Sequence, residues 1–270
     1  MNNSGQPFIP TAPHAKPFGR SSRAEFLARV TFGLAAAATA RSLSAAAGPA
    51  IRSAQPSSPQ DRLQAKVKQW DVITIGNLAR NRYWGESDDK AVRSTVCTCT
   101  VVQGDGFRLI VDPSLSNADE MFRELDRRTG LKPRDITAAF VTHEHGDHWF
   151  GLAHFSEARW FAAPAVAAAL NNTRKLPKQV EPVTGQLFDT VELLPTPGHT
   201  LSHHSLRFTC DGKAVVIAGD AVMTRDFWRE QRGYYKSVDL ELATKTMNEI
   251  AGLADLVVPG HDNYFLNLNS

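Results

Sequence analysis

The chain carries one dense run of potential metal ligands, Thr142-His143-Glu144-His145-Gly146-Asp147-His148. It directly follows the apolar segment Ile136–Val141, which predicts a buried strand. In an extended loop, alternate side chains point to the same side, so His143 and His145 can share one ion. Asp147 and His148 then lie at the start of the next helical turn, displaced towards a second ion. A buried strand holds such a loop rigid, and zinc requires ligands fixed at about 2.0–2.2 Å.

Three later segments repeat this arrangement of a strand followed by a ligand. His199 stands in Pro197-Gly198-His199, Asp220 in Ala218-Gly219-Asp220, and His261 in Pro259-Gly260-His261. In each of them a glycine precedes the ligand and lets the backbone turn sharply. Four strand ends therefore deliver imidazoles and carboxylates, which suit zinc, iron and manganese. A solvated polar loop does not account for this recurrence.

The elements around these ligands are short and mixed in type. Alternating or buried apolar runs predict strands, and helical spacing with glycine stops predicts helices. The expected strands are Asp71–Ile75, Thr95–Gln103, Phe107–Val111, Ile136–Val141, Arg159–Ala162, Thr190–Leu194, His204–Thr209, Ala214–Ile217 and Leu256–Val258. The expected helices are Asn117–Thr129, Pro164–Leu170 and Val238–Leu253. Strands and helices without strict alternation predict a layered α+β fold.

On these residues the sequence resembles the metallo-β-lactamase superfamily. The family's His-x-His-x-Asp-His motif stands at 143–148, and the later ligands follow in the family's order. The resemblance covers about residue 70 to the end and implies a four-layered αβ/βα sandwich with metals at one edge. It implies a first ion held by His143, His145 and His199. It also implies a second ion held by Asp147, His148 and His261, with Asp220 bridging both.

Two further residues match family positions outside the ligand set. Asp112, in Val111-Asp112-Pro113, corresponds to the Asp of the family's first motif, which braces the site. His203 corresponds to the second His of the family's Gly-His-Thr-x-Gly-His form, although Ser202 replaces the Gly. The resemblance places both residues around the metal ligands; for His203 a purely structural hydrogen-bonded role is the alternative.

The ligand set predicts a dinuclear zinc hydrolase. A water molecule that bridges two zinc ions loses a proton near neutral pH, and the resulting metal-bridged hydroxide is the nucleophile. Asp147 is the predicted catalytic residue, because it orients this water and takes its proton. The expected substrate is a small-molecule ester, lactone, thioester or phosphoester.

Two other functions stay open. The alternative enzyme is a mononuclear iron oxygenase resembling the persulfide dioxygenases of the same superfamily, with His143, His199 and Asp220 as a facial triad. The other is a metal-binding protein without catalysis, which the complete ligand set disfavours.

Differences from particular groups of the superfamily narrow the set of groups that this chain resembles. Asp220 stands where class B1 lactamases place Cys, and the nine residues after His261 leave no room for the helical glutathione-binding extension of glyoxalase II. Acyl-homoserine lactonases place a Tyr where this chain has Met223; Tyr234 or Tyr235 is the candidate to replace it in space. The ending Leu253–His261 is similar to the small metallo-β-lactamase domain-containing protein 1 group.

The walls of the pocket are expected from two loops, Asn77–Val92 and Arg225–Asp239. The second loop carries an aromatic and basic run that suits closure over an anionic substrate, with a solvated loop as the alternative.

The first 68 residues read as a leader, and residues 69–270 as the metallo-β-lactamase-fold domain. The leader has nine Lys or Arg against two acids, and nine of the 17 residues in Leu34–Ala50 are Ala. A polar start, a modest apolar stretch and Ala45-Ala46-Ala47 predict a cleavable export signal and a periplasmic protein. An organellar transit peptide, or a disordered tail on a cytoplasmic protein, is the alternative. The apolar stretch is too short for a transmembrane helix.

Charge and cysteine content exclude other classes. The remainder of the chain has 21 basic and 26 acidic residues, a net charge of −5, so nucleic-acid binding is not expected. The three cysteines cannot close a disulfide framework. The expected partner is a small molecule, and the sequence does not predict an oligomeric state.

Overall fold

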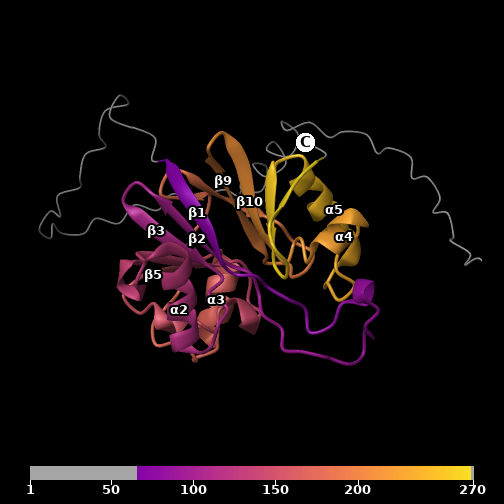
Figure 1. Ribbon diagram of the computed structural model, residues 1–270, viewed down its shortest axis with the longest axis horizontal. Helices are drawn as coiled ribbons and strands as arrows, with labels where there is room; N and C mark the ends of the chain where they lie inside the picture. Colours follow the sequence, from indigo (N-terminus) through magenta and orange to yellow (C-terminus); the bar gives the residue numbers. More distant parts are fainter. Residues whose placement is uncertain (1–65, 269–270) are drawn as a thin grey trace, which may run out of the picture. The chain divides into compact units, whose positions relative to one another are not determined.

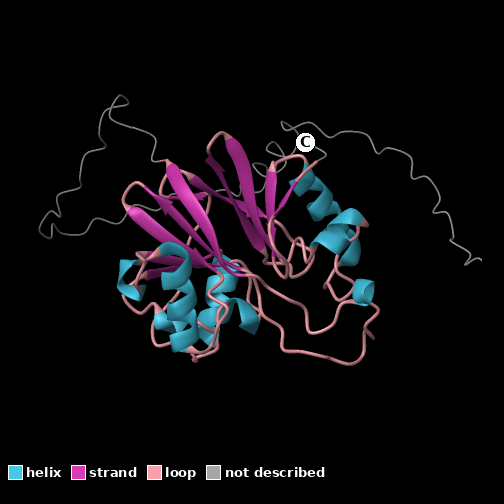
Figure 2. Cartoon of the chain, in the orientation of Figure 1, coloured by secondary structure: helices cyan, strands magenta, loops and turns pink. Residues whose placement is uncertain are grey.

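The computed structural model describes residues 66–268, which fold as two β-sheets with helices on their outer faces (Figures 1 and 2). The first sheet has the order β1-β2-β3-β4-β5-β6 and the second has the order β12-β11-β10-β9-β8-β7. Helices α2 and α3 lie against the first sheet, and α4 and α5 lie on the outer side of the second (Figure 1). This is the predicted four-layered αβ/βα sandwich.

The strands of the first sheet are β1 (Val67–Thr74), β2 (Cys99–Gly104), β3 (Phe107–Val111), β4 (Ala138–Val141), β5 (Arg159–Ala162) and β6 (Glu181–Pro182). Those of the second are β7 (Gln186–Leu187), β8 (Val191–Pro195), β9 (His204–Cys210), β10 (Lys213–Gly219), β11 (Leu256–Pro259) and β12 (Phe265–Leu266). The helices are α2 (Ala118–Thr129), α3 (Pro164–Asn172), α4 (Arg225–Arg229) and α5 (Leu240–Ala251). Four 3₁₀ turns connect them: Arg82–Trp84, Pro133–Asp135, Gly146–His148 and Leu152–His154.

Side chains along the strands of the first sheet point alternately to its two faces, and each face contributes to a separate hydrophobic core. Leu109 and Phe140 face the second sheet and pack there against Leu206 and Val215. Their neighbours Ile110 and Ala139 face the other way, into the core under α2 and α3. Because both faces are buried, the central strands read as nearly continuous apolar runs.

Several element boundaries differ from the prediction for local reasons. Residues 95–98 do not join β2, because Thr98 donates its backbone N–H to the carbonyl oxygen of Gly260 at 2.6 Å. Helix α5 begins at Leu240, two residues after the expected start, because the side chain of Asp239 caps it by accepting from the N–H of Leu242. The sequence does not predict the two-residue strands β6, β7 and β12 or the short helix α4. Segments of two to five residues are too short to show a periodic pattern of apolar residues.

Strand β1 begins at Val67, so the boundary expected after residue 68 falls inside this strand. The predicted leader and its signal segment otherwise lie outside the described residues. Within residues 66–268, none of the helices combines the length and apolar character that a membrane crossing requires. In the same residues Cys97, Cys99 and Cys210 are buried and unbridged.

The topology explains how distant ligands meet at one edge. Strands β3 and β4 are parallel, so Asp112 and the loop that starts at Thr142 leave the first sheet side by side. Strands β10 and β11 are also parallel, so Asp220 and His261 leave the second sheet together. Strand β8 runs antiparallel to β9, as β10 does, so the chain from β8 to His199 leaves at the same edge as Asp220. All predicted site residues therefore reach one end of the sandwich.

Candidate metal centre

Four ligand atoms form a first cluster. Nδ1 of His145 lies 3.0 Å from Nε2 of His143 and 2.9 Å from Nε2 of His199. Oδ2 of Asp220 lies 3.1 Å from Nε2 of His199 and 3.7 Å from Nε2 of His143. Ligands of a tetrahedral zinc ion, each about 2.1 Å from the metal, stand about 3.4 Å apart. The cluster therefore has the dimensions of one zinc site.

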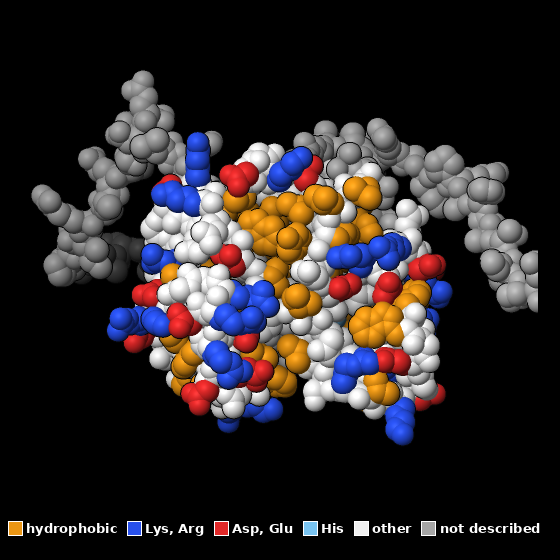
Figure 3. Space-filling view, viewed as in Figure 1, with side chains coloured by type: hydrophobic (Ala, Val, Ile, Leu, Met, Phe, Trp, Pro, Cys, Tyr) orange, Lys and Arg blue, Asp and Glu red, His pale blue; other side chains and the backbone are white. Residues whose placement is uncertain are grey.

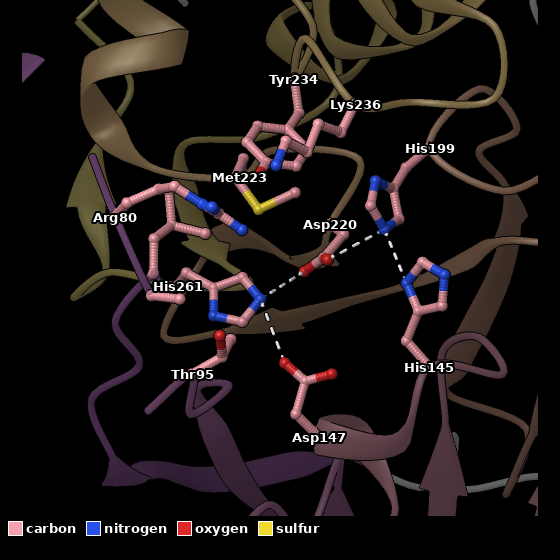
Figure 4. Close-up of a pocket in the computed structure, with 12 residues that line it drawn as sticks. Arg80, Thr95, His145, Asp147, His199, Asp220, Met223, Tyr234, Lys236 and His261 are labelled. Atoms are coloured by element: carbon pink, nitrogen blue, oxygen red, sulfur yellow. Dashed lines mark hydrogen bonds and ion pairs between the residues drawn. The ribbon is translucent and has the colours of Figure 1, made fainter. Parts of the chain in front are cut away.

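A second cluster lies on the other side of Asp220 (Figure 4). Oδ1 of Asp220 is 3.2 Å from Nε2 of His148 and 3.3 Å from Nε2 of His261. Oδ2 of Asp147 is 3.6 Å from the same nitrogen of His261. Asp220 thus presents one carboxylate oxygen to each cluster. A carboxylate that bridges two ions, as the resemblance implies for Asp220, would need this position.

Hydrogen bonds on the far side of the rings place a proton on Nδ1 of His261 and of His148. Nδ1 of His261 faces the carbonyl oxygens of Val96 at 2.9 Å and Asn77 at 3.2 Å, so it must donate. Nδ1 of His148 donates to a carboxylate oxygen of Asp112 at 2.9 Å. Nε2 of each ring faces the Asp220 carboxylate. Burial by itself lowers the pKa of both imidazoles, but the negative groups around them, Asp220 among them, outweigh it and raise the pKa. A divalent cation would take the place of a proton on Nε2.

Buried atoms without partners support the same conclusion. Nε2 of His148 and Oδ1 of Asp220 are buried and have no hydrogen-bond partner within the described part of the chain. Such groups are costly unless something pairs with them. A divalent cation bound between them satisfies both, so the residues present fit a metal ion at each cluster.

The charges in the site favour ligation. Burial lowers the pKa of His199 to about 4, which keeps its imidazole neutral and able to bind a metal. Burial by itself raises the pKa of Asp220, but the imidazoles of His261, His148 and His199 outweigh it and hold the pKa well below its ordinary value. Asp220 is therefore an anion in the folded protein.

Asp112, which the resemblance places around the ligands, forms hydrogen bonds with the loop after β4. Its Oδ1 accepts from the backbone N–H of Thr142 at 2.8 Å, and its Oδ2 accepts from the Thr142 hydroxyl at 2.8 Å and from His148. Since the Thr142 hydroxyl gives its proton to Asp112, it accepts from Nδ1 of His143 at 3.1 Å. One buried carboxylate thereby orients a ligand of each cluster, directly for His148 and through Thr142 for His143.

His203 contacts the backbone of the bridging residue. Its Nε2 accepts from the N–H of Asp220 at 3.1 Å, while its Nδ1 donates to the hydroxyl of Thr196 at 2.8 Å. Thr196 donates onward to Ser205, which donates to the carbonyl oxygen of Ala218. Burial lowers the pKa of His203 well below its ordinary value, which keeps the ring neutral in this chain of hydrogen bonds. His203 therefore positions Asp220.

Glycine at 260 is needed for close approach. A Cβ atom there would lie 1.9 Å from Oδ1 of Asp220 and 3.0 Å from the backbone carbon of Gly219. Two adjacent strand ends can therefore bring Asp220 and His261 to one ion only if this residue has no side chain.

Comparison with known families agrees with this geometry. The family model described as "Metallo-beta-lactamase superfamily" matches residues 93–261, which include Asp112 and every residue of both clusters. The chain belongs to the metallo-β-lactamase superfamily.

Individual relatives within the superfamily are more distant. The chain is 31% identical to a hydroxyacylglutathione hydrolase of Xanthomonas axonopodis pv. citri, over 46% of this chain and 45% of that protein. It is 29% identical to metallo-beta-lactamase domain-containing protein 1 of Xenopus laevis, over 60% of this chain and 69% of that protein. The chain thus spans less than half the length of the hydroxyacylglutathione hydrolase.

Solved structures of this superfamily share the fold. A quorum-quenching N-acyl homoserine lactone lactonase superposes with a TM-score of 0.56 at 21% identity, over 68% of this chain and 86% of that one. At this identity the likeness establishes the fold alone.

A pocket of about 260 Å³ opens over both clusters (Figure 4). Its floor contains Asp147, Asp220 and three of the histidines: His145, His199 and His261. Five of its wall residues come from the two predicted loops, Asn77–Val92 and Arg225–Asp239, whereas Thr95 and Met223 lie outside them. These wall residues are Leu78, Ala79, Arg80, Thr95, Met223, Tyr234 and Lys236.

The structure distinguishes the two tyrosines that the sequence left open. Tyr234 lines the pocket, with its ring centroid 6.1 Å from that of His199. Tyr235 is not among the lining residues; the Arg82 guanidinium lies 3.9 Å from its ring centroid. Of the two tyrosines, Tyr234 is therefore the one whose ring lies beside the first cluster.

Proposed function

We propose that this protein is a dinuclear zinc hydrolase that cleaves a small ester, lactone, thioester or phosphoester. The proposal depends chiefly on one observation, the two complete ligand clusters that share the carboxylate of Asp220. The small volume of the pocket supports a small-molecule substrate.

His143, His145 and His199 would hold one zinc ion, Asp147, His148 and His261 the other, and Asp220 both. Zinc ions bound there lower the pKa of a water molecule and polarise the oxygen of the scissile carbonyl or phosphoryl group.

The protein's own residues do the rest. The Asp147 side chain is 20% exposed, whereas that of Asp220 is 4% exposed, so a water molecule in the pocket reaches Asp147. We therefore assign to Asp147 the orientation of the attacking water and the acceptance of its proton. Asp112 and His203 hold the ligands in place and do not touch the substrate.

An iron oxygenase needs only part of this site. Its triad of His143, His199 and Asp220 lies entirely in the first cluster and leaves Asp147, His148 and His261 without an ion. The second cluster is equally well braced, through Asp112 and through the carbonyl oxygens of Val96 and Asn77. The hydrolase accounts for both clusters.

A substrate panel tests the proposal. Zinc-loaded protein is assayed with an aryl ester, a γ-lactone, a thioester and an aryl phosphodiester. We expect turnover of at least one class, a loss of about 100-fold or more after chelation, and recovery when zinc is restored. Activity that survives chelation would contradict the proposal, and so would oxygen uptake with a persulfide substrate and iron.

A further inference from the structure

We infer that Arg80 binds a carboxylate group of the substrate. This carboxylate stands at the end of the substrate that is remote from the scissile bond. This inference rests on the proposed function and narrows its substrate class to small anionic esters or thioesters.

Arg80 differs from the other arginines of the loop between β1 and β2. Arg82 forms an ion pair with Asp88, and Arg93 forms one with Glu86. Arg80 has no hydrogen bond or ion pair with any residue in the described range 66–268. It is nevertheless half-buried and lines the pocket. A guanidinium that faces a pocket and has no anionic partner in the protein is free to bind an anion there.

The Arg80 side chain is directed into the pocket. Figure 4 shows it extending above His261 towards Met223 and Tyr234, on the open side of the metal centre. A planar guanidinium in this position can bind a carboxylate through two parallel hydrogen bonds.

Outside the two proposed metal clusters, the charged residues that line the pocket are all positive. Its two carboxylates, Asp147 and Asp220, belong to the proposed metal clusters and are neutralised by the ions that they hold. The remaining charged lining residues are Arg80 and Lys236, and both are cations. The ammonium group of Lys236 donates to the backbone carbonyl oxygen of Asp88 at 3.4 Å, and the Asp88 carboxylate partly compensates its charge. Arg80 is therefore the lining cation that has no anionic partner within residues 66–268. A pocket lined by one sign of charge raises the local concentration of an oppositely charged substrate.

The wall around Arg80 defines the rest of the substrate. Leu78, Ala79 and Met223 supply apolar surface in the same pocket as Arg80 and the two clusters. A pocket with these three kinds of surface suits a short aliphatic chain with the scissile carbonyl at one end and a carboxylate at the other.

A binding experiment tests the subsite without turnover. Titration calorimetry compares glutarate with glutaramate, which replaces one carboxylate by an amide, on zinc-loaded full-length protein. In each ligand one carboxylate can bind the metal centre, so only the remote group differs. We expect glutarate to bind the wild type about 10-fold more tightly, and Arg80→Met to bind both ligands equally.

Two further variants separate a direct contact from a general effect. Lys90→Met removes one positive charge from the same loop, at an exposed position that does not line the pocket, and leaves the preference unchanged. Arg80→Lys restores part of the preference. Equal affinity of the wild type for the two ligands would overturn the inference, even if Arg80→Met failed to fold. Equal weakening of both ligands by Arg80→Met would overturn it as well.

Kinetics extend the test to the reaction. S-acetyl-3-mercaptopropionate and its amide are hydrolysed with the same bond changes: the C–S bond breaks, water supplies the new C–O bond, and the thiol leaves with a proton. We expect a ratio of kcat/KM of about 10 in favour of the carboxylate for the wild type and near 1 for Arg80→Met, mainly through KM. Absence of any thioester turnover would count against the proposed reaction, while the calorimetric comparison would still decide the role of Arg80.

Discussion

Replacement of Asp220 by Ala is expected to lower kcat/KM by about 10³-fold or more. Asp220 supplies one oxygen to each cluster, at 3.1 Å from His199 and 3.2 Å from His148, so its loss weakens both ion sites at once. The zinc content should fall well below two ions per chain. Steady-state assays with the best substrate of the panel, together with elemental analysis of the same preparation, measure both effects.

Asp89→Ala is the matched control, because it removes an exposed carboxylate that lies outside the pocket. It should keep wild-type activity and metal content. An Asp220→Ala protein with full activity would show that the shared carboxylate is not part of the catalytic machinery.

Asp112→Ala is expected to act on stability and on metal affinity together. Asp112 is buried and accepts three hydrogen bonds, two from Thr142 and one from His148. Its removal leaves these donors unsatisfied, which costs about 3 kcal/mol of unfolding free energy. Loss of the group that orients His148 weakens zinc binding by about 10- to 100-fold. Urea unfolding of metal-free protein and competition with a chromogenic chelator measure the two effects separately.

A second variant, Asp112→Asn, separates the loss of the negative charge from the loss of the hydrogen-bond acceptor. The φ angle of Asp112 is +50°, a conformation that Asn tolerates better than Ala. The Asn variant keeps an acceptor for the backbone of Thr142 but lacks the negative charge, so it should be the more stable of the two and still bind zinc weakly. Wild-type zinc affinity in both variants would mean that Asp112 does not orient the ligands.

The meeting of the candidate ligands at one edge was predictable, because each follows a strand whose apolar residues are readable in the sequence. His143 comes just after β4, Asp220 after β10 and His261 after β11, and parallel pairing brings such ends together. The structure adds the contacts of Asp112, which accepts hydrogen bonds from Thr142 and His148. For His203 the structure shows how it acts, through a hydrogen bond from the N–H of Asp220.

The pocket wall was not predictable in the same way. Arg80 lies in an irregular loop whose course depends on long-range contacts, such as the bond from the Asn81 amide to Asp226 at 3.3 Å. No periodic pattern encodes such a contact, so the sequence identified the loop and not the residue. For the same reason it left Tyr234 and Tyr235 equivalent.

The export signal and the periplasmic location stay predictions, because they concern residues before the described range. N-terminal sequencing of the mature protein from the native host is the direct test of that leader.

The central claim, two zinc ions in two clusters that share Asp220, is tested most directly by the metal content of the wild-type protein. Elemental mass spectrometry of protein purified without chelator or added metal gives the ions per chain. The account predicts about two zinc ions per chain, as the two clusters require. About one iron ion per chain, with no zinc, would contradict it and would indicate oxygen chemistry at the first cluster alone.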